Sequence, residues 1–146
     1  MTTRASFAAA LFPLLLASLA VAGPGRAQED CKTFKEVPEG ATTFTILVDD
    51  EAVPQFDCVA VKPKKTTITW QGTPNAESVL VAFKKPSLCA GADPDKPAPG
   101  KPAQKPGKAV LDRKKMNAPG KYCYSIVVIR RDGTVRTVDP KLIINP

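Results

Sequence analysis

The sequence predicts an all-β protein, and more specifically a Greek-key antiparallel β-sandwich of seven to eight strands. Three observations lead to this fold class. Short runs rich in β-branched and aromatic residues recur along the chain, turn-forming Gly, Pro, Asn and Asp residues separate them about every eight to twelve residues, and no stretch has convincing helical periodicity. This pattern is typical of two packed sheets rather than of a helical or α/β protein.

The C-terminal stretch, residues 119–146, has the clearest strand pattern. Tyr122–Arg131 is a run of mostly β-branched and aromatic residues with two largely apolar faces, which predicts a strand in the middle of a sheet. Asp132-Gly133 separates it from Thr134–Val138, and Asp-Gly between two such runs predicts a hairpin with a type I′ turn. The Asp-Pro pair that follows breaks the pairing, and Leu142–Ile144 is expected to form a last short strand.

Alternating or apolar runs predict further strands upstream. In Thr42–Asp49 the side chains of Phe44, Ile46 and Val48 share one face, as expected for a half-buried strand. Asp112–Asn117 is expected to form one turn of helix at most. The other expected strands are an edge strand within Cys31–Val37 and the runs Phe56–Val61, Thr66–Trp70 and Ser78–Lys84. In the last of these the side chains of Val79, Val81 and Phe83 share one face.

Residues 86–108 differ in composition from the rest of the chain. The segment is rich in Pro, Lys, Gly and Ala and has almost no bulky apolar residue. Such a composition buries too little surface to offset the entropy of ordering, so we expect an extended, partly disordered loop inserted in the domain, with local polyproline II character. A proline-rich ligand for an SH3-like partner is the alternative, which the expected export of the chain disfavours.

The first 27 residues predict export. A short basic start at Met1–Arg4 precedes the apolar run Phe7–Val21, and small residues follow, which is the order of a secretory signal peptide. The apolar run is about 15 residues long, which is short for a membrane span. We therefore expect cleavage after Ala27, or alternatively after Ala22. The protein is then secreted or periplasmic rather than an integral membrane protein, and residues 28–146 form a single β-sandwich domain.

Four cysteines follow the expected signal peptide, at Cys31, Cys58, Cys89 and Cys123. They are widely spaced and include no C-x-x-C pair. An even set of this kind in an oxidising compartment predicts two disulfides. Cys31 and Cys58 flank the first strand and Cys89 and Cys123 flank the proline-rich loop, so we expect the pairs Cys31–Cys58 and Cys89–Cys123.

Two short motifs resemble the cupredoxin-like fold: Ile68-Thr69-Trp70 and Gly120-Lys121-Tyr122-Cys123-Tyr124. In that family an I-T-W-type strand and a late G-x-Y-x-Y strand belong to a Greek-key sandwich, and the resemblance covers roughly residues 42–146. A blue-copper site takes histidines and a cysteine thiolate around the metal. This sequence has no histidine and places its cysteine between the two tyrosines. The resemblance therefore implies a copper-free version of the fold.

The order Cys58, Trp70, Cys123 resembles a second family, the immunoglobulin-like sandwich. There a tryptophan packs on a disulfide between the sheets, which implies a Cys58–Cys123 bond. The tyrosine corner of that family does not fit, because Lys121 stands two residues before Cys123 and the neighbouring tyrosine is Tyr122. The immunoglobulin-like sandwich is thus the second interpretation of the fold.

The residue types present speak against an enzyme. Without histidine, Ser-His-Asp and Cys-His nucleophile pairs and the common zinc hydrolase sites are excluded. The acidic runs Asp49–Glu51 and Asp93–Asp95 are neighbours in expected turns, whereas a glycosidase needs carboxyls that converge across a cleft. Asp49–Glu51 also lacks the D-x-D-x-D-G spacing of a calcium loop. We expect no catalytic residue, no metal site and no cofactor.

The chain is basic, with 21 Lys and Arg against 14 Asp and Glu and a net charge of +7. Removing residues 1–27 removes Arg4 and Arg26, which leaves 19 against 14, or +5. Many of these cations stand at expected turns and strand ends, including the pair Lys114-Lys115. The residues expected to form an anion-binding surface are Lys62, Lys64, Lys65, Lys84, Lys85, Arg130, Arg131 and Arg136.

Two interpretations of these charges stay open. They can act as gatekeepers that discourage edge-to-edge aggregation. They can also form a surface for an anionic glycan, a lipid headgroup or an acidic protein. No interleaved aromatic platform accompanies them, so nucleic acid is disfavoured. The sequence favours an exported, non-enzymatic binding or accessory domain, and the alternative is a redox or metal-binding protein derived from the cupredoxin fold.

Overall fold

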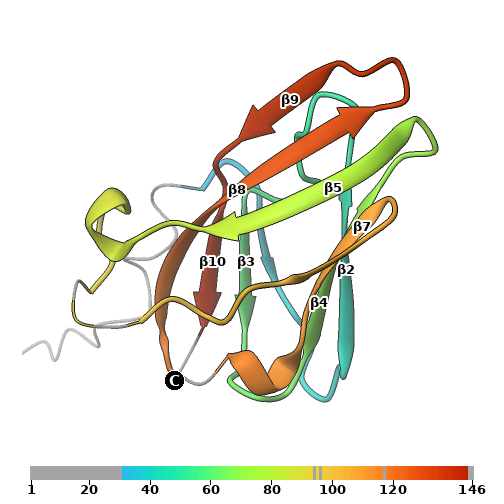
Figure 1. The fold of residues 1–146 in the computed structure, drawn as a ribbon. Coiled ribbons are helices and arrows are strands. Elements are labelled where there is room, and N and C mark those ends of the chain that lie inside the picture. Colours follow the sequence, from blue (N-terminus) through green and yellow to red (C-terminus); the bar gives the residue numbers. More distant parts are fainter. Residues whose placement is uncertain (1–30, 94, 96, 117, 145–146) are drawn as a thin grey trace, which may run out of the picture.

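The computed structural model describes residues 31–93, 95, 97–116 and 118–144 (Figure 1). The expected signal peptide and both candidate cleavage sites lie outside the described residues. Within them the protein is all-β, with ten strands in two sheets and two short 3₁₀ turns. Among the described residues no helix is both long and apolar enough to cross a membrane.

The two sheets are built from strands that are far apart in the sequence. The larger sheet has the order β1-β3-β10-β8-β5, with β9 also paired to β8, and the smaller has the order β2-β4-β7-β6. The 3₁₀ turns are η1 (Pro86–Leu88) and η2 (Arg113–Lys115). The strands are β1 (Phe34–Glu36), β2 (Thr43–Val48), β3 (Cys58–Val61), β4 (Thr67–Gly72), β5 (Ala76–Phe83), β6 (Ala103–Lys105), β7 (Lys108–Leu111), β8 (Gly120–Arg130), β9 (Val135–Val138) and β10 (Lys141–Ile144).

The inner faces of the sheets pack against each other around one main hydrophobic core, to which strands of both sheets contribute. The alternation in the sequence predicted these faces correctly. In β2, Ile46 and Val48 are buried while Leu47 between them is exposed, and in β5 the buried residues are Val79 and Val81. Along β8 every second residue is buried, and the strand is paired on both edges, which confirms its predicted central place.

One aromatic pair joins the two sheets at the centre of the core. Trp70 of β4 and Tyr124 of β8 are both fully buried, and their ring centroids are 5.3 Å apart in an edge-to-face arrangement. The Nε1–H group of Trp70 donates a hydrogen bond to the hydroxyl oxygen of Tyr124 at 3.2 Å. The hydrogen bond gives a partner to both buried polar groups, the indole N–H group and the phenol oxygen.

The sheets are mixed, because three of the eight strand pairings among the described residues are parallel and five are antiparallel. The prediction of a purely antiparallel sandwich is therefore only partly right, and the described strands number ten rather than seven to eight. Strands β1 and β10 run parallel to β3, and β2 runs parallel to β4. The chain passes from β2 through β3 in the other sheet before it returns to β4. Residue alternation reports which face of a strand is buried, but it carries no information about the neighbouring strand, which is why the sequence did not reveal these pairings.

The hairpin between β8 and β9 forms where it was predicted, but with a different turn. The amide of Gly133 donates to the carbonyl of Arg130, and the amide of Arg130 donates to the carbonyl of Thr134, so three residues form the loop. Gly133 has a φ of 81°, while Asp132 does not have a positive φ. The turn is therefore a glycine-bulge turn rather than the expected type I′ turn, and the side chain of Asp132 accepts from the amide and the hydroxyl of Thr134.

The second half of the proline-rich segment is ordered structure, which corrects its interpretation as a partly disordered loop. Residues 103–105 form strand β6, which pairs with β7. Its Gln104 donates from Nε2 to the carbonyl oxygen of Val81 at 3.1 Å, and the amide of Gly107 donates to the carbonyl of Glu77 at 3.0 Å. Both carbonyls belong to β5, the edge strand of the other sheet. The segment thus covers an exposed sheet edge, a function for which few bulky apolar residues are needed.

Replacing Tyr124 with Phe should destabilise the fold by about 1–3 kcal/mol, because the buried indole N–H of Trp70 loses its acceptor. The matched control is Tyr122→Phe, which removes a hydrogen bond to the carbonyl oxygen of Ala118 in a partly buried position. It should cost about 1 kcal/mol or less. Urea unfolding of both variants measures the difference, and equal losses would contradict the central role of the Trp70–Tyr124 pair.

The two tyrosines should also make the fold sensitive to alkali. Burial raises the pKa of both phenols, and the charge of Asp93 adds to the effect on Tyr122. Because the folded state holds these protons more tightly than the unfolded chain, the stability they contribute is complete below about pH 10, the unfolded value, and is lost as the pH rises above it. Tyrosinate absorbance should therefore appear together with unfolding. A folded protein that titrates a tyrosine below pH 10 would contradict this.

Candidate anion-binding site

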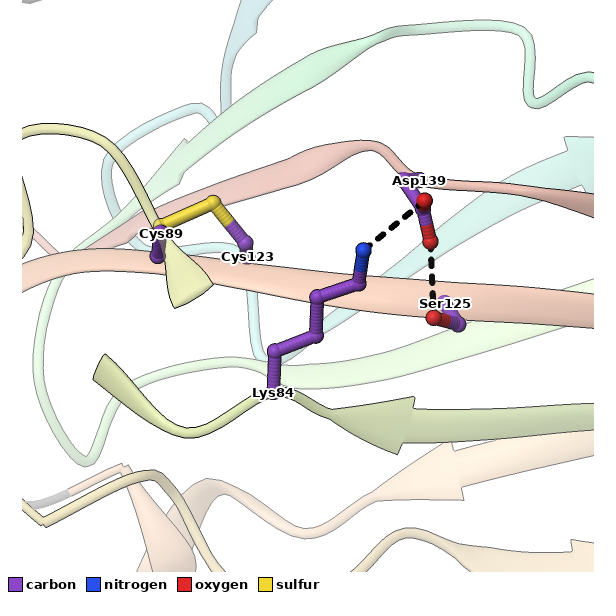
Figure 2. The surroundings of a disulfide bond; sticks show 5 residues. All are labelled: Lys84, Cys89, Cys123, Ser125 and Asp139. Atoms are coloured by element: carbon purple, nitrogen blue, oxygen red, sulfur yellow. Dashed lines mark hydrogen bonds and ion pairs between the residues drawn. A yellow bond between two sulfur atoms is a disulfide. The ribbon is translucent and has the colours of Figure 1, made fainter. Parts of the chain in front are cut away.

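The cysteines form the two predicted pairs. The Cα atoms of Cys31 and Cys58 are 5.8 Å apart, and those of Cys89 and Cys123 are 5.4 Å apart (Figure 2). The Cys58–Cys123 bond that the immunoglobulin-like interpretation requires is not formed, and Trp70 packs on Tyr124 instead of on a disulfide. Two disulfides indicate an oxidising environment.

Lys84, one of the predicted anion-binding residues, is already paired. Its ammonium lies 2.8 Å from a carboxylate oxygen of Asp139, whose other oxygen accepts from the hydroxyl of Ser125 (Figure 2). These hydrogen bonds, the one from Lys84 first, lower the pKa of Asp139. Lys85 is exposed at the start of η1. Asp139 therefore offsets the charge of Lys84, whereas Lys85 adds an exposed positive charge.

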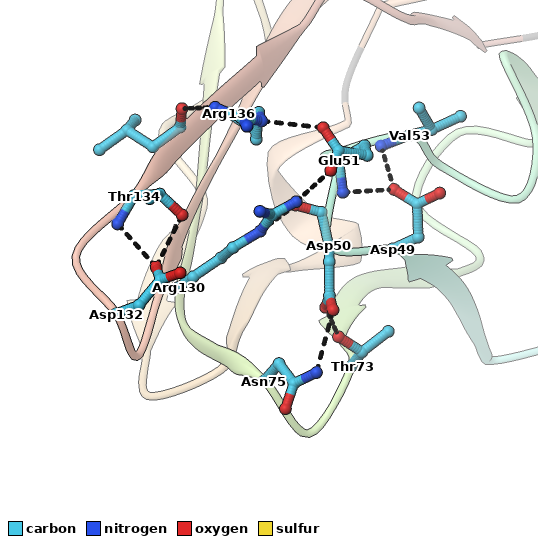
Figure 3. Close-up of polar contacts among 11 residues, drawn as sticks. Asp49, Asp50, Glu51, Val53, Thr73, Asn75, Arg130, Asp132, Thr134 and Arg136 are labelled. Carbon is cyan, nitrogen blue, oxygen red and sulfur yellow. Dashed lines mark hydrogen bonds and ion pairs between the residues drawn. The ribbon is translucent and has the colours of Figure 1, made fainter.

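The arginines at the far end of β8 are paired as well. Arg130 and Arg136 both bind the carboxylate of Glu51, and Nε of Arg130 also donates to the carbonyl oxygen of Asp50 at 2.8 Å (Figure 3). The hydrogen bonds from the two arginines lower the pKa of Glu51. Arg131 is exposed beside them. Sequence reasoning missed this cluster because its members are about eighty residues apart in the chain.

The neighbouring carboxylates accept hydrogen bonds that hold the loop together. Asp49 accepts from the amides of Glu51 and Val53, and Asp50 accepts from the side chains of Thr73 and Asn75 (Figure 3). These two side-chain hydrogen bonds lower the pKa of Asp50. Within the described part of the chain, no group of three or more His, Cys, Asp or Glu residues could hold a metal ion.

The turn between β3 and β4 contains the other three predicted residues. Lys62 pairs with Glu39 at 2.8 Å, a contact that raises the pKa of the lysine and lowers that of the glutamate. Lys64 and Lys65 are exposed. Lys64 has a φ of 55°, in the left-handed region that a residue other than glycine rarely adopts.

This turn lies against η2, which is also basic. The amide of Lys64 donates to the carbonyl of Met116 at 3.2 Å, and the amide of Arg113 lies 3.5 Å from the hydroxyl of Thr67. In Figure 1 the green β3–β4 turn and the orange η2 lie together at the foot of the sandwich. We call this cluster of five exposed cations the basic end; its residues are Lys64, Lys65, Arg113, Lys114 and Lys115.

The basic end and the arginine cluster lie at opposite ends of the molecule. Ile144 pairs with both Val61 and Gly120, so the start of β8 lies beside the β3–β4 turn. Arg130 is at the other end of the same strand, about 30 Å away at the usual rise per residue. The eight predicted residues therefore do not share one face. Arg113 joins the basic end through a tertiary contact that no local pattern in the sequence signals.

A hollow of about 260 Å³ opens beside the basic end. One wall is the proline-rich segment ahead of β6, and the other is η2 with the chain that follows it. Lys115 donates from Nζ to the carbonyl oxygen of Lys101 at 2.6 Å and so connects the two walls. The lining residues are Pro97, Ala98, Pro99, Gly100, Lys114, Lys115, Ala118 and Tyr122.

The comparisons with known proteins give no assignment. No protein-family model matches the chain, and no curated protein matches its sequence.

The backbone at Lys64 supports a direct test. Lys64→Gly should raise stability by up to about 1 kcal/mol, because glycine adopts a positive φ without the steric cost paid by other residues. Lys65→Gly, at a neighbouring position without a positive φ, should lower stability by about 0.5–1 kcal/mol. Both changes remove one exposed lysine, so their difference in urea unfolding isolates the backbone effect. Equal effects would show that Lys64 carries no conformational cost.

Proposed function

We propose that this protein is an exported, non-enzymatic binding domain that attaches to an anionic polymer through its basic end. The contact between Lys64 and Met116 carries the proposal, because it brings two lysine-rich segments from distant parts of the chain to one surface. None of Lys64, Lys65, Arg113 and Lys114 forms an ion pair with a described residue. Their charge is therefore available to a partner, unlike that of Lys62, Lys84, Arg130 and Arg136.

A location outside the cytoplasm is part of the proposal. The two disulfides support an oxidising compartment, and the sequence of residues 1–27 has the order of a signal peptide. A secreted or periplasmic domain meets anionic glycans, lipid headgroups and acidic proteins, which are the partners that a cluster of lysines attracts.

The fold is proposed to be a copper-free cupredoxin-like sandwich with a Greek-key path. The two motifs behind this resemblance supply Trp70 and Tyr124, the pair that joins the sheets. The alternative function, a redox or metal-binding protein derived from that fold, finds less support. The sequence has no histidine, all four cysteines are in disulfides, and the acidic residues around Asp50 bind backbone amides, hydroxyls and arginines.

Binding of this kind is collective. Exposed lysines attract a polyanion through the sum of their fields, and dissolved salt screens these fields over about 10 Å at 0.1 M ionic strength. The interaction should therefore weaken steeply with added salt, and loss of one lysine should matter less than loss of several.

The test compares two triple variants with the same net charge. Lys64→Gln, Lys65→Gln and Lys114→Gln together remove three charges from the basic end, and Lys85→Gln, Lys105→Gln and Arg131→Gln remove three exposed charges elsewhere. On a heparin column the first variant should elute at clearly lower salt than the wild type, because the removed charges act together. The second should elute close to the wild type. Equal shifts for both variants, or no retention of the wild type at low salt, would contradict the proposal.

A further inference from the structure

We propose that the hollow beside the basic end receives one acidic sugar unit of an anionic polysaccharide, an inference that rests on the proposed function and narrows its partner to that class. The hollow is about 260 Å³, below the roughly 300–1,000 Å³ of pockets for drug-sized ligands. It therefore suits a single ring-sized unit with its charged group rather than a larger ligand.

The walls of the hollow match the chemistry of a sugar ring. Pro97 contributes an exposed pyrrolidine ring, and Pro99 and the aromatic side chain of Tyr122, which is only 6% exposed, line the hollow as buried residues. The hydroxyl of Tyr122 already donates to the carbonyl oxygen of Ala118 at 2.9 Å, which fixes the ring. The C–H faces of a sugar can pack on such apolar surfaces while its hydroxyl groups stay in contact with water.

The two lysines of the hollow have different roles. Nζ of Lys115 is bound to the carbonyl oxygen of Lys101, so Lys115 holds the proline-rich wall in place as a positioning residue. Lys114 is exposed on the rim, and in its hydrogen bonds with described residues only the backbone amide is engaged, with the carboxylate of Asp112. The ammonium of Lys114 is therefore the group that meets the carboxylate of a bound sugar.

Gly100 makes this arrangement sterically possible. A Cβ atom at this position would lie 2.9 Å from Cδ of Lys115, closer than such atoms approach in proteins, and 3.2 Å from its Cγ, which is a tight contact. The stem of Lys115 therefore packs along the backbone of residue 100. Gly100→Ala displaces Lys115 and changes the shape of the hollow without any change in charge, so it separates the hollow from the collective attraction of the basic end.

The surroundings favour a polysaccharide over a membrane surface. Peripheral membrane sites usually combine basic residues with apolar side chains that enter the lipid. In the described part of the chain, no exposed large apolar residue lies in the basic end or the hollow. The exposed large apolar residues of the described chain all lie elsewhere; they are Leu47, Val53, Leu80, Leu88 and Val135.

Calorimetry at low ionic strength with three trimers tests the proposal. Trigalacturonate carries sugar rings and carboxylates, galactotriose carries the sugar rings without carboxylates, and triglutamate carries carboxylates without sugar rings. We expect trigalacturonate to bind at least about tenfold more tightly than either of the others, because only it uses both the walls and Lys114. Lys114→Gln and Gly100→Ala should each weaken its binding by about tenfold, whereas Lys105→Gln, an exposed lysine on β6, should leave it unchanged.

Inorganic polyphosphate separates this inference from the proposed function, since it has charge but no sugar ring. Wild type and Gly100→Ala should bind it equally. Equal affinity for trigalacturonate and triglutamate, or unchanged trigalacturonate binding in Gly100→Ala, would overturn the proposed sugar subsite. If polyphosphate still bound, the proposal that the basic end binds polyanions would stand. Tighter binding to phosphatidylglycerol vesicles than to polygalacturonate would assign the surface to lipid instead. Failure to bind any polyanion would overturn both proposals.

Discussion

The buried contact between Trp70 and Tyr124 is the constraint on which the rest of the fold depends. Each residue lies on an inner strand of its sheet, and the hydrogen bond between indole and phenol gives each of these buried polar groups a partner. Because the two side chains are large and their contact is directional, they fix how β4 and β8 face each other. The β3–β4 turn at one end and the β8–β9 hairpin at the other take their places from these two strands.

The proline-rich segment, residues 86–108, both covers the edge of strand β5 and forms part of the candidate binding surface. Its Gln104 and Gly107 satisfy carbonyls at the open edge of β5, and the preceding residues form one wall of the hollow. A segment that pairs with an edge needs backbone groups and a few polar side chains rather than apolar bulk. The same composition that makes it look unstructured therefore suits it both to cover an edge and to shape a shallow site.

The sequence was most informative where local physics decides the structure. Alternation with a period of two placed Val79, Val81 and the inner residues of β8 in the core, and the positions of the cysteines relative to the strands led to the observed disulfides. The parallel pairing of β2 with β4 and the covering of β5 depend on contacts between distant segments, so no local pattern encodes them. The same holds for the basic end, since the contact of Lys64 with Met116 groups cations that are separate in the chain.

The most direct measurement of the central claim is a map of backbone amide chemical shifts on addition of polygalacturonate at low salt. If the basic end is the binding surface, the largest changes fall on residues 62–66 and 113–116, which are held together by the Lys64–Met116 contact. They should fade together as salt is added, because screening acts on the whole cluster. Largest changes at residues 130–136, or small changes spread evenly over the protein, would contradict the account.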